Sequence, residues 1–438
     1  MFRVASLTEI DYLTLLLACL VLGLGLASIT GATYTGTGNQ WLSQTKWVLL
    51  SFPFLFGVIF IDYRQLIRYA PIFYVLGVIG LLLCFAPVIG HKSHGANSWL
   101  KVGPLQMQPS EIVKLTTLLM LARWLGARKG QWDGLLDVLK PLAIGVLPAI
   151  FILGQPDLGT AIVFGPMTLV LMFVAGLPVT HLCLVLSPMF CLLGAFHSIE
   201  IILLWVAGLT ALLLASVWNR VPWTLWLPFL VLAGAAYGGV FVYGETIWDK
   251  LPAHHQARIE NYLNPEANMR DTGYNIMQSK IALGSGGFKG KGMGNSTQAE
   301  YEFLPEYEHD FAFSILGEQM GFIGGSVLLG LFLLLITRGV DTAMESRSLE
   351  GALIATGVIS IFFAHIFINV GMVTGVLPVT GLPLTFVSYG GTFMLTNMVG
   401  VGLLLNIRMQ SRRVEDPEAR FTGRPPMALP AKVDDDQF

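Results

Sequence analysis

The chain has 438 residues, of which 54% are hydrophobic and only 12% are charged. A soluble globular domain carries about twice that share of charged residues, so the composition excludes an ordinary soluble protein. The formal net charge is −2, which gives no reason to expect a nucleic-acid partner. The four cysteines lie inside apolar blocks without paired spacing, and we interpret them as packing residues rather than disulfides or metal ligands.

Twelve apolar blocks are long enough to cross the hydrocarbon core of a membrane, which takes about 20 helical residues. We therefore predict an all-α fold, a polytopic transmembrane helical bundle over 1–407, followed by a polar, disordered tail over 408–438. Two of the three blocks between 180 and 243 could be removed without changing the side of any later loop. The predicted spans are 12–30, 47–62, 70–89, 111–126, 139–154, 158–176, 180–197, 199–218, 223–243, 313–337, 351–373 and 383–407.

Basic residues fall unequally on the two sides of the predicted bundle. Short loops rich in Lys and Arg stay in the cytoplasm, and the short connections assigned to the outside hold only Lys46, Lys92 and Lys101. We therefore predict that both termini are cytoplasmic. The same parity makes the one long loop, 244–312, extracytoplasmic.

Four charged residues stand at membrane depth, where an unpaired charge costs at least a few kcal/mol and marks a functional candidate: Glu111, Lys114, Asp157 and Glu318. Glu111 and Lys114 are three apart at the start of a helix, so they share a face and can pair. Such a pair either only fixes the helix or serves a polar site. Asp157 follows Pro156 and precedes an apolar helix, and capping of that helix alone would explain it.

The predicted outer loop contains a glycine-lysine segment, residues 280–294, in which six glycines are interleaved with Lys280, Lys289 and Lys291. Closely spaced glycines allow backbone N–H groups to approach an oxyanion, and adjacent lysines favour a phosphate or diphosphate. The segment lacks the Gly-Lys-Ser/Thr ending of a nucleotide-binding loop. The alternative is an irregular, flexible loop that binds nothing.

Three acids and a histidine come directly before the next predicted span: Glu306, Glu308, His309 and Asp310. Crowded carboxyl groups at a membrane boundary raise one another's pKa by like-charge repulsion and desolvation. One of them could then act as a general base near neutral pH. The alternative is a solvated cluster that only caps the following helix.

Several stretches together resemble one family, the shape, elongation, division and sporulation (SEDS) proteins, which polymerise peptidoglycan glycan strands. They run in family order from about 90 to 405, and 371–375 (GMVTG) with 381–384 (GLPL) look more like its rod-shape branch than its division branch. Family members have about ten spans, so two apolar blocks here are extra. The matching stretches are 97–100 (NSWL), 108–114 (QPSEIVK), 155–160 (QPDLGT), 273–280 (GYNIMQSK), 284–292, 302–310, 369–378 and 388–391 (SYGG).

The resemblance implies a glycosyltransferase that uses lipid II, a disaccharide-pentapeptide on undecaprenyl diphosphate, during cell-wall elongation. Asp310 falls on the family's catalytic residue, and a carboxylate there can take the proton from the acceptor sugar's 4-hydroxyl. Attack from the face opposite the departing diphosphate would give an inverted, beta-1,4 product. The other candidates for cavity or substrate-binding residues are Glu111, Lys114, Asp157, Arg258, Lys280, Lys289, Lys291, Glu306 and Ser388.

The resemblance also implies partners and a location. The partners are lipid II, the undecaprenyl-diphosphate-linked nascent glycan and a class B penicillin-binding protein that crosslinks new strands, all at the bacterial inner membrane. No cofactor is specified, although a divalent cation, Mg²⁺ or Mn²⁺, could stand beside the diphosphate. Two alternatives stay open: a lipid II flippase whose intramembrane charges line a path, and the division branch of the same enzymes. A transporter has no need for a base at its outer face, which favours the polymerase.

Overall fold

The computed structural model of the chain describes most of the predicted bundle. The three spans predicted between 180 and 243 lie outside the described residues except at isolated positions, and Arg258, Glu306 and the tail beyond 413 also lie outside them. The described residues are 9–33, 39–86, 90–93, 96–102, 105–128, 135–179, 272–301, 303–305 and 307–413, with scattered single positions elsewhere.

The described residues form nine long helices, which correspond to the other nine predicted spans and confirm the helical fold class. Seven of them are long and apolar enough to cross a membrane. Of the other two, α6 is shorter and α4 carries charged side chains. The nine helices are α1 (Tyr12–Thr33), α2 (Gln40–Phe60), α3 (Tyr63–Leu83), α4 (Pro109–Arg128), α5 (Leu135–Gly154), α6 (Leu158–Val174), α13 (Ala312–Met344), α14 (Leu349–Thr374) and α15 (Gly391–Arg413).

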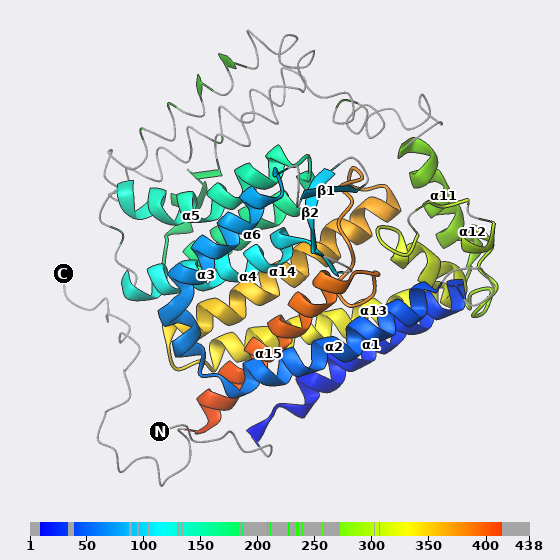
Figure 1. Cartoon of the computed structure of the whole chain (residues 1–438), viewed down its shortest axis with the longest axis horizontal. Helices are drawn as coiled ribbons and strands as arrows, with labels where there is room; N and C mark the ends of the chain where they lie inside the picture. The colour runs from blue at the N-terminus through cyan, green and yellow to red at the C-terminus, as the bar shows by residue number, and fades with distance from the viewer. Residues whose placement is uncertain are drawn as a thin grey trace.

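Helix α14 lies at the centre of the bundle. It packs against α4 and α6 and also against α13 and α15, while α1 packs on α13 and α2 packs on α15 (Figure 1). The sequence of α14 is apolar on nearly every side, which suits a helix that is surrounded by other helices. A polar side chain on α14 therefore has to find its partners inside the protein.

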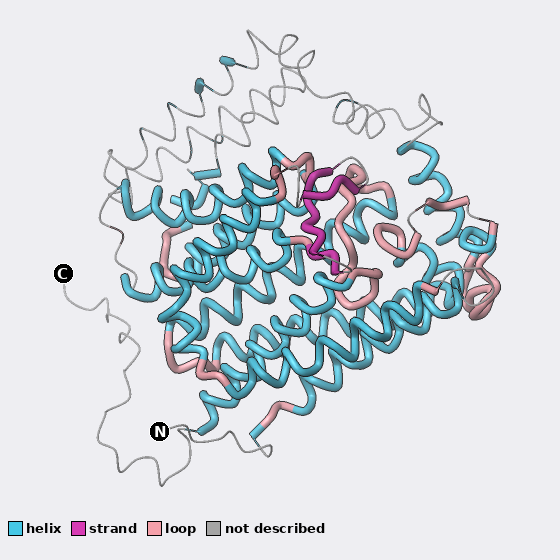
Figure 2. Tube along the Cα trace, in the orientation of Figure 1, coloured by secondary structure: helices cyan, strands magenta, loops and turns pink. Residues whose placement is uncertain are grey.

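A small antiparallel sheet connects α3 to α4, and the predicted all-α bundle did not include it. Its strands are β1 (Gly90–Ser93), β2 (Ala96–Val102) and β3 (Leu105–Met107), in the order β1-β2-β3 (Figure 2). Ser98 and Leu100 are buried whereas Lys101 is exposed, as expected for a strand with one covered face. The sheet leads the chain directly into Gln108 and the start of α4.

Part of the predicted outer loop 244–312 is helical. It contains α11 (Thr272–Ser285) and the short α12 (Thr297–Glu300), and both lie at the same end of the bundle as the sheet (Figure 1). We call this the site end. The opposite end, where α1 begins and α15 ends, is called the Arg-rich end.

Salt bridges on Asp11 hold the Arg-rich end together. The Asp11 carboxylate accepts from Arg338 Nη2 at 2.8 Å and forms an ion pair with Arg408, whose Nε lies 3.2 Å away; Arg408 Nη2 also lies 3.2 Å from Glu345 Oε1. Burial alone would raise the pKa of the Asp11 carboxyl, but Thr14, Arg338 and Arg408 outweigh burial and hold it below its ordinary value. These contacts explain why α15 continues beyond the predicted boundary at 407.

Asn406 ties α15 to the turn between α2 and α3. Its side-chain amide donates to the carbonyl oxygens of Val58, Ile59 and Ile61 at 2.9, 2.9 and 2.6 Å. The last turn of α2 has backbone carbonyls without a helical partner, and the amide satisfies them. Asn406 is fully buried, so this contact is a structural joint of the Arg-rich end.

Candidate active site

Glu111 and Lys114 form the predicted pair on the first turns of α4. Lys114 Nζ lies 3.0 Å from Glu111 Oε1 and 2.9 Å from Oε2, and both side chains are almost fully buried. The Thr396 hydroxyl on α15 donates to Glu111 Oε2 at 3.4 Å. A buried ion pair needs such further polar partners, because burial removes the water that would otherwise solvate it.

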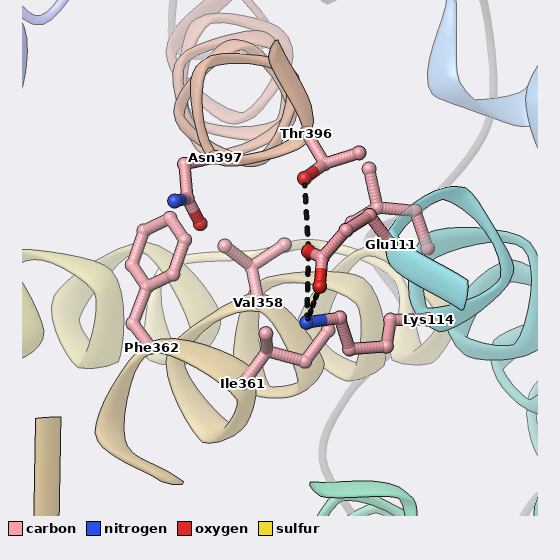
Figure 3. A pocket seen from close by; sticks show the side chains of 8 residues that line it. Glu111, Lys114, Val358, Ile361, Phe362, Thr396 and Asn397 are labelled. Carbon is pink, nitrogen blue, oxygen red and sulfur yellow. Dashed lines mark hydrogen bonds and ion pairs between the residues drawn. The ribbon is translucent and has the colours of Figure 1, made fainter. Parts of the chain in front are cut away.

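A pocket lies beside this ion pair, between α4, α14 and α15. Its cavity volume is about 10 Å³, which is roughly the space that one water molecule needs. Figure 3 shows the Glu111 carboxylate and the Lys114 ammonium on one wall and Asn397 on the other. The Asn397 side-chain nitrogen is buried and has no hydrogen-bond partner among the described residues. The pocket therefore offers charged and amide groups to a molecule the size of water inside an apolar surround, with Val358, Ile361 and Phe362 completing its wall.

His365 is a second partner of Lys114 and was not among the site residues predicted from the sequence. Its Nε2 lies 2.7 Å from Lys114 Nζ, and its Nδ1 lies 3.0 Å from the carbonyl oxygen of Pro383. The ring is fully buried and packs on Phe393, with ring centroids 4.9 Å apart. The signal that could have found it is a lone imidazole within the apolar run of α14.

The α14–α15 loop, residues 375–390, is irregular backbone packed inside the bundle. Such backbone is stable at membrane depth only where protein groups satisfy its carbonyls and amides. Gln44 of α2 does so at one end of the loop, donating to Ser388 O at 3.3 Å and accepting from Gly390 N at 3.2 Å. Ser388, a predicted cavity residue, is fully buried, and its hydroxyl accepts from Leu384 N at 2.8 Å. Ser388 thus closes a turn within the loop.

Asp310 stands at the end of the acid cluster, against this loop. Its carbonyl oxygen accepts from Asn369 Nδ2 at 2.8 Å, and the same amide donates to Leu382 O at 2.7 Å. Gly381 has a φ of +74°, and a Cβ added there would lie 3.3 Å from Asp310 Oδ2. The carboxylate of Asp310 is therefore half-buried beside a glycine of the α14–α15 loop.

The residues before Asp310 are bound to the far end of the same loop. Tyr389 N donates to Glu308 O at 2.8 Å, and His309 Nδ1 lies 3.0 Å from Tyr389 O. The Glu308 carboxylate also accepts from Gln40 of α2, at 3.4 Å. These contacts fix the backbone on which Asp310 stands.

Asp157 caps α6, the structural role that the sequence left open for it beside a role in the cavity. Its carboxylate accepts from Thr160 N at 3.0 Å and from Thr160 Oγ1 at 2.9 Å, and Gln108 Nε2 donates to it at 3.0 Å. Gly159 lies against the same loop as Asp310, since a Cβ there would be 2.5 Å from Thr380 O. The first turn of α6, which Asp157 caps, and the Asp310 carboxylate therefore both lie against the Thr380–Gly381 backbone.

The glycine-lysine segment docks on a break in α13. Gly321 interrupts the helix with φ 67° and ψ −162°, so the neighbouring backbone groups lose their helical partners. Lys291 N and Gly292 N donate to Glu318 O and Gln319 O, while the N–H groups of 322 and 323 donate to the carbonyls of 287 and 288, all within 2.9 to 3.2 Å. These loop amides, which we expected to be available to an oxyanion, bind the helix instead.

Glu318 anchors the same segment through its side chain. The carboxylate is fully buried and accepts from Lys291 Nζ, Ser296 Oγ and Thr297 Oγ1 at 2.5, 2.5 and 2.7 Å. Lys291 is thus paired inside the protein. Lys280 and Lys289 are exposed, and Lys280 Nζ lies beside Gly375, where an added Cβ would be 2.6 Å away.

The described residues contain no group of three or more His, Cys, Asp or Glu side chains arranged to hold a metal ion.

Comparison with known proteins identifies the family. The sequence model of the FtsW, RodA and SpoVE family, described as "Cell cycle protein", matches residues 8–413, and the chain belongs to this family. It is 32% identical over 434 residues to peptidoglycan glycosyltransferase RodA of Treponema pallidum, covering 92% of this chain and 99% of that one. It is 34% identical over 340 residues to peptidoglycan glycosyltransferase MrdB of Escherichia coli K12, covering 77% of each. The resemblance expected from the motifs is confirmed.

Solved structures share the fold. A chain of a peptidoglycan synthase complex, studied for the structural coordination of polymerization and crosslinking, matches with a TM-score of 0.67 and 26% identity over 92% of this chain and 98% of that one. Rod shape determining protein RodA of Thermus thermophilus matches with a TM-score of 0.59 and 24% identity, over 91% of this chain and 96% of that one. The chain is thus a multi-pass membrane protein of the same architecture.

Proposed function

We propose that this chain is a peptidoglycan glycosyltransferase of the rod-shape branch, which polymerises lipid II into beta-1,4-linked glycan strands. The observation that carries the proposal is the position of Asp310, whose half-buried carboxylate lies against the α14–α15 loop at the site end. The relatives named RodA and MrdB support the reaction class and favour the elongation branch over the division branch.

Asp310 is the general base of the proposed reaction. Its carboxylate takes the proton from the 4-hydroxyl of the acceptor sugar as the oxygen attacks the anomeric carbon of the donor. The bond from that carbon to the diphosphate breaks, and undecaprenyl diphosphate leaves with the bonding electron pair. Attack from the opposite face inverts the configuration, so one carboxylate suffices and no covalent intermediate forms.

The departing diphosphate needs positive charge nearby, since negative charge develops on it in the transition state. Lys280 and Lys289 are exposed on the glycine-lysine segment, and Lys280 lies beside the start of the α14–α15 loop at Gly375. Lys291 supports the reaction indirectly, by holding this segment on Glu318. Arg258 belongs to the same outer loop in the sequence.

The buried Glu111–Lys114 pair lies close to the site end, and the pocket beside it has room for about one water molecule. This polar region therefore supports the site from within the bundle and does not itself hold the sugar. We infer that the site end faces outward from the inner membrane, since Arg338 and Arg408 lie at the opposite end and basic residues near span ends are retained on the cytoplasmic side.

The proposed partner is a class B penicillin-binding protein, which would crosslink the strands that this chain makes. A structural neighbour is part of a peptidoglycan synthase complex that coordinates polymerization and crosslinking, which supports a two-protein arrangement. The partner supplies the transpeptidase chemistry, because none of the residues at the site described above is a serine nucleophile paired with a base.

Polymerisation of lipid II by the purified protein tests the function. Asp310→Asn keeps the size of the side chain and removes the base, so we expect a rate at least about 100-fold lower. Asp341→Asn is the matched control, because Asp341 is an exposed carboxylate at the Arg-rich end. Polymer made by Asp310→Asn at the parental rate would show that the base is elsewhere. If the protein reconstituted in vesicles moves lipid II across the bilayer without making polymer, it is a flippase and the proposal is overturned.

A further inference from the structure

Two buried polar side chains on α14 are not used by the mechanism above. His365 and Asn369 are both fully buried and lie four residues apart, so they project from the same face of the helix. That face meets the α14–α15 loop, where His365 contacts Pro383 O and Asn369 contacts Leu382 O. Two consecutive carbonyls of the loop are therefore held by consecutive turns of one helix.

The hydrogen bonds of His365 define one neutral tautomer. The Lys114 ammonium can only donate, so Nε2 of the ring accepts from it at 2.7 Å. The Pro383 carbonyl can only accept, so Nδ1 carries the ring proton and donates to it at 3.0 Å. A neutral imidazole with its proton on Nδ1 satisfies both neighbours at once. His365 thus connects the ion pair of α4 to the loop.

Asn369 extends this connection to the base. Its Nδ2 donates both to Leu382 O and to Asp310 O, so the loop and the backbone of Asp310 are held by a single amide. Gly381, the residue before Leu382, faces the Asp310 carboxylate. A displacement of the loop at Pro383 would consequently move both the amide contact and the wall beside the carboxylate.

We propose that His365 is a positioning residue that transmits the state of the Glu111–Lys114 pair through the α14–α15 loop and Asn369 to Asp310. The polar chain runs from Lys114 to His365, then along the backbone from Pro383 to Leu382, and through Asn369 to the base. A rearrangement of the Glu111–Lys114 pair thereby changes the geometry of the carboxylate. This inference rests on the proposed function for its kinetic readout and on the contacts alone for its structural readout.

The kinetic test compares three variants with the parent in lipid II polymerisation. His365→Leu fills a similar space without hydrogen bonds, and we expect kcat to fall about 10- to 100-fold, with little change in KM, because a misplaced base slows the chemical step. His365→Gln restores one acceptor and one donor, and most of kcat should return. Asn406→Leu is the matched control, because it removes a buried amide that serves only the Arg-rich end.

Hydrogen–deuterium exchange of the same variants gives a readout that needs no activity. His365→Leu should speed exchange in segments 307–311 and 376–390, and His365→Gln should leave both near the parent. Asn406→Leu should speed exchange around 58–62 and leave 307–311 unchanged. The proposal is wrong if His365→Leu leaves kcat and the exchange rates of both segments at parental values. It is also wrong if His365→Gln is no closer to the parent in kcat and exchange than His365→Leu is. If the unsubstituted protein makes no polymer, only the proposed function is overturned. The exchange measurements would still test whether His365 connects Lys114 to the backbone of Asp310.

Discussion

Lys291 and Glu318 form a salt bridge across the point where the glycine-lysine segment meets α13, with Nζ and Oε1 2.5 Å apart. The carboxylate is completely buried, whereas the lysine side chain is 28% exposed. The bridge therefore lies at the surface of a polar cluster whose interior consists of hydroxyl and backbone N–H groups around Glu318.

Loss of the lysine should destabilise the protein, because the carboxylate would remain buried with one partner fewer. We expect Lys291→Met to lower the free energy of unfolding by about 1–3 kcal/mol, visible as a lower Tm in detergent. Lys289→Met, at an exposed neighbour, is the control and should leave Tm nearly unchanged. The double variant Lys291→Met/Glu318→Gln should lose less free energy of unfolding than the two single variants lose together. Strict additivity of the two would contradict the contact.

The break in α13 should tolerate no side chain. A Cβ at Gly321 would lie 2.3 Å from Gly290 N, and its φ of +67° is unfavourable for other residues. Gly321→Ala should therefore lower the free energy of unfolding by about 1–3 kcal/mol and make the segment 286–292 sensitive to protease. Gly330→Ala, in the same helix with no atom within 4 Å, should be neutral or stabilising. Equal Tm values for the two variants would show that the break carries no strain.

A methyl group at position 381 should impair the proposed chemistry more than the fold. It would contact Asp310 Oδ2 at 3.3 Å and require a strained φ of +74°. We expect Gly381→Ala to lower the polymerisation rate about 10-fold or more, because small shifts of a base are costly. Gly165→Ala on α6, where an added Cβ meets nothing within 4 Å, is the matched control. A parental rate for Gly381→Ala would mean that the carboxylate works without this close wall.

The Arg-rich end should weaken in acid. The pKa of Asp11 lies below its ordinary value of 3.8, so its stabilising contribution is fully present above that value and is lost as the pH falls through the lower, folded-state pKa. Asp11→Asn should lower Tm at neutral pH and flatten the fall of Tm below about pH 4. Asp62→Asn, at an exposed helix cap that Asn also suits, should leave the whole profile unchanged. A parallel shift of the Asp11→Asn profile would exclude this carboxyl as the acid-sensitive group.

Local chemistry made part of the site predictable from the sequence. Glu111 and Lys114 share a helix face by their spacing, and Asp157 occupies the position of a helix cap, so both contacts follow from neighbours in the chain. The helical fold followed in the same way from the length of the apolar blocks.

Contacts between distant segments could not be read in this way. Lys291 was assigned to a diphosphate because the sequence shows its glycine neighbours but not its contact with Glu318, which lies 27 residues further on. His365 and the α14–α15 loop depend on how α4 and α14 pack, and no local pattern encodes that packing. The strands of the small sheet are short, and their half-polar sequence resembles that of a loop.

The interruption at Gly321 also limits how the length of this part of the chain can change. Surface connections commonly accept insertions and deletions, but the stretch from 286 to 292 replaces missing partners of a helix with the carbonyls of 287 and 288 and the N–H groups of 291 and 292. One additional or missing residue between 288 and 291 would prevent the two pairs from meeting the helix at the same time. Its length is therefore as constrained as that of the helix on which it lies.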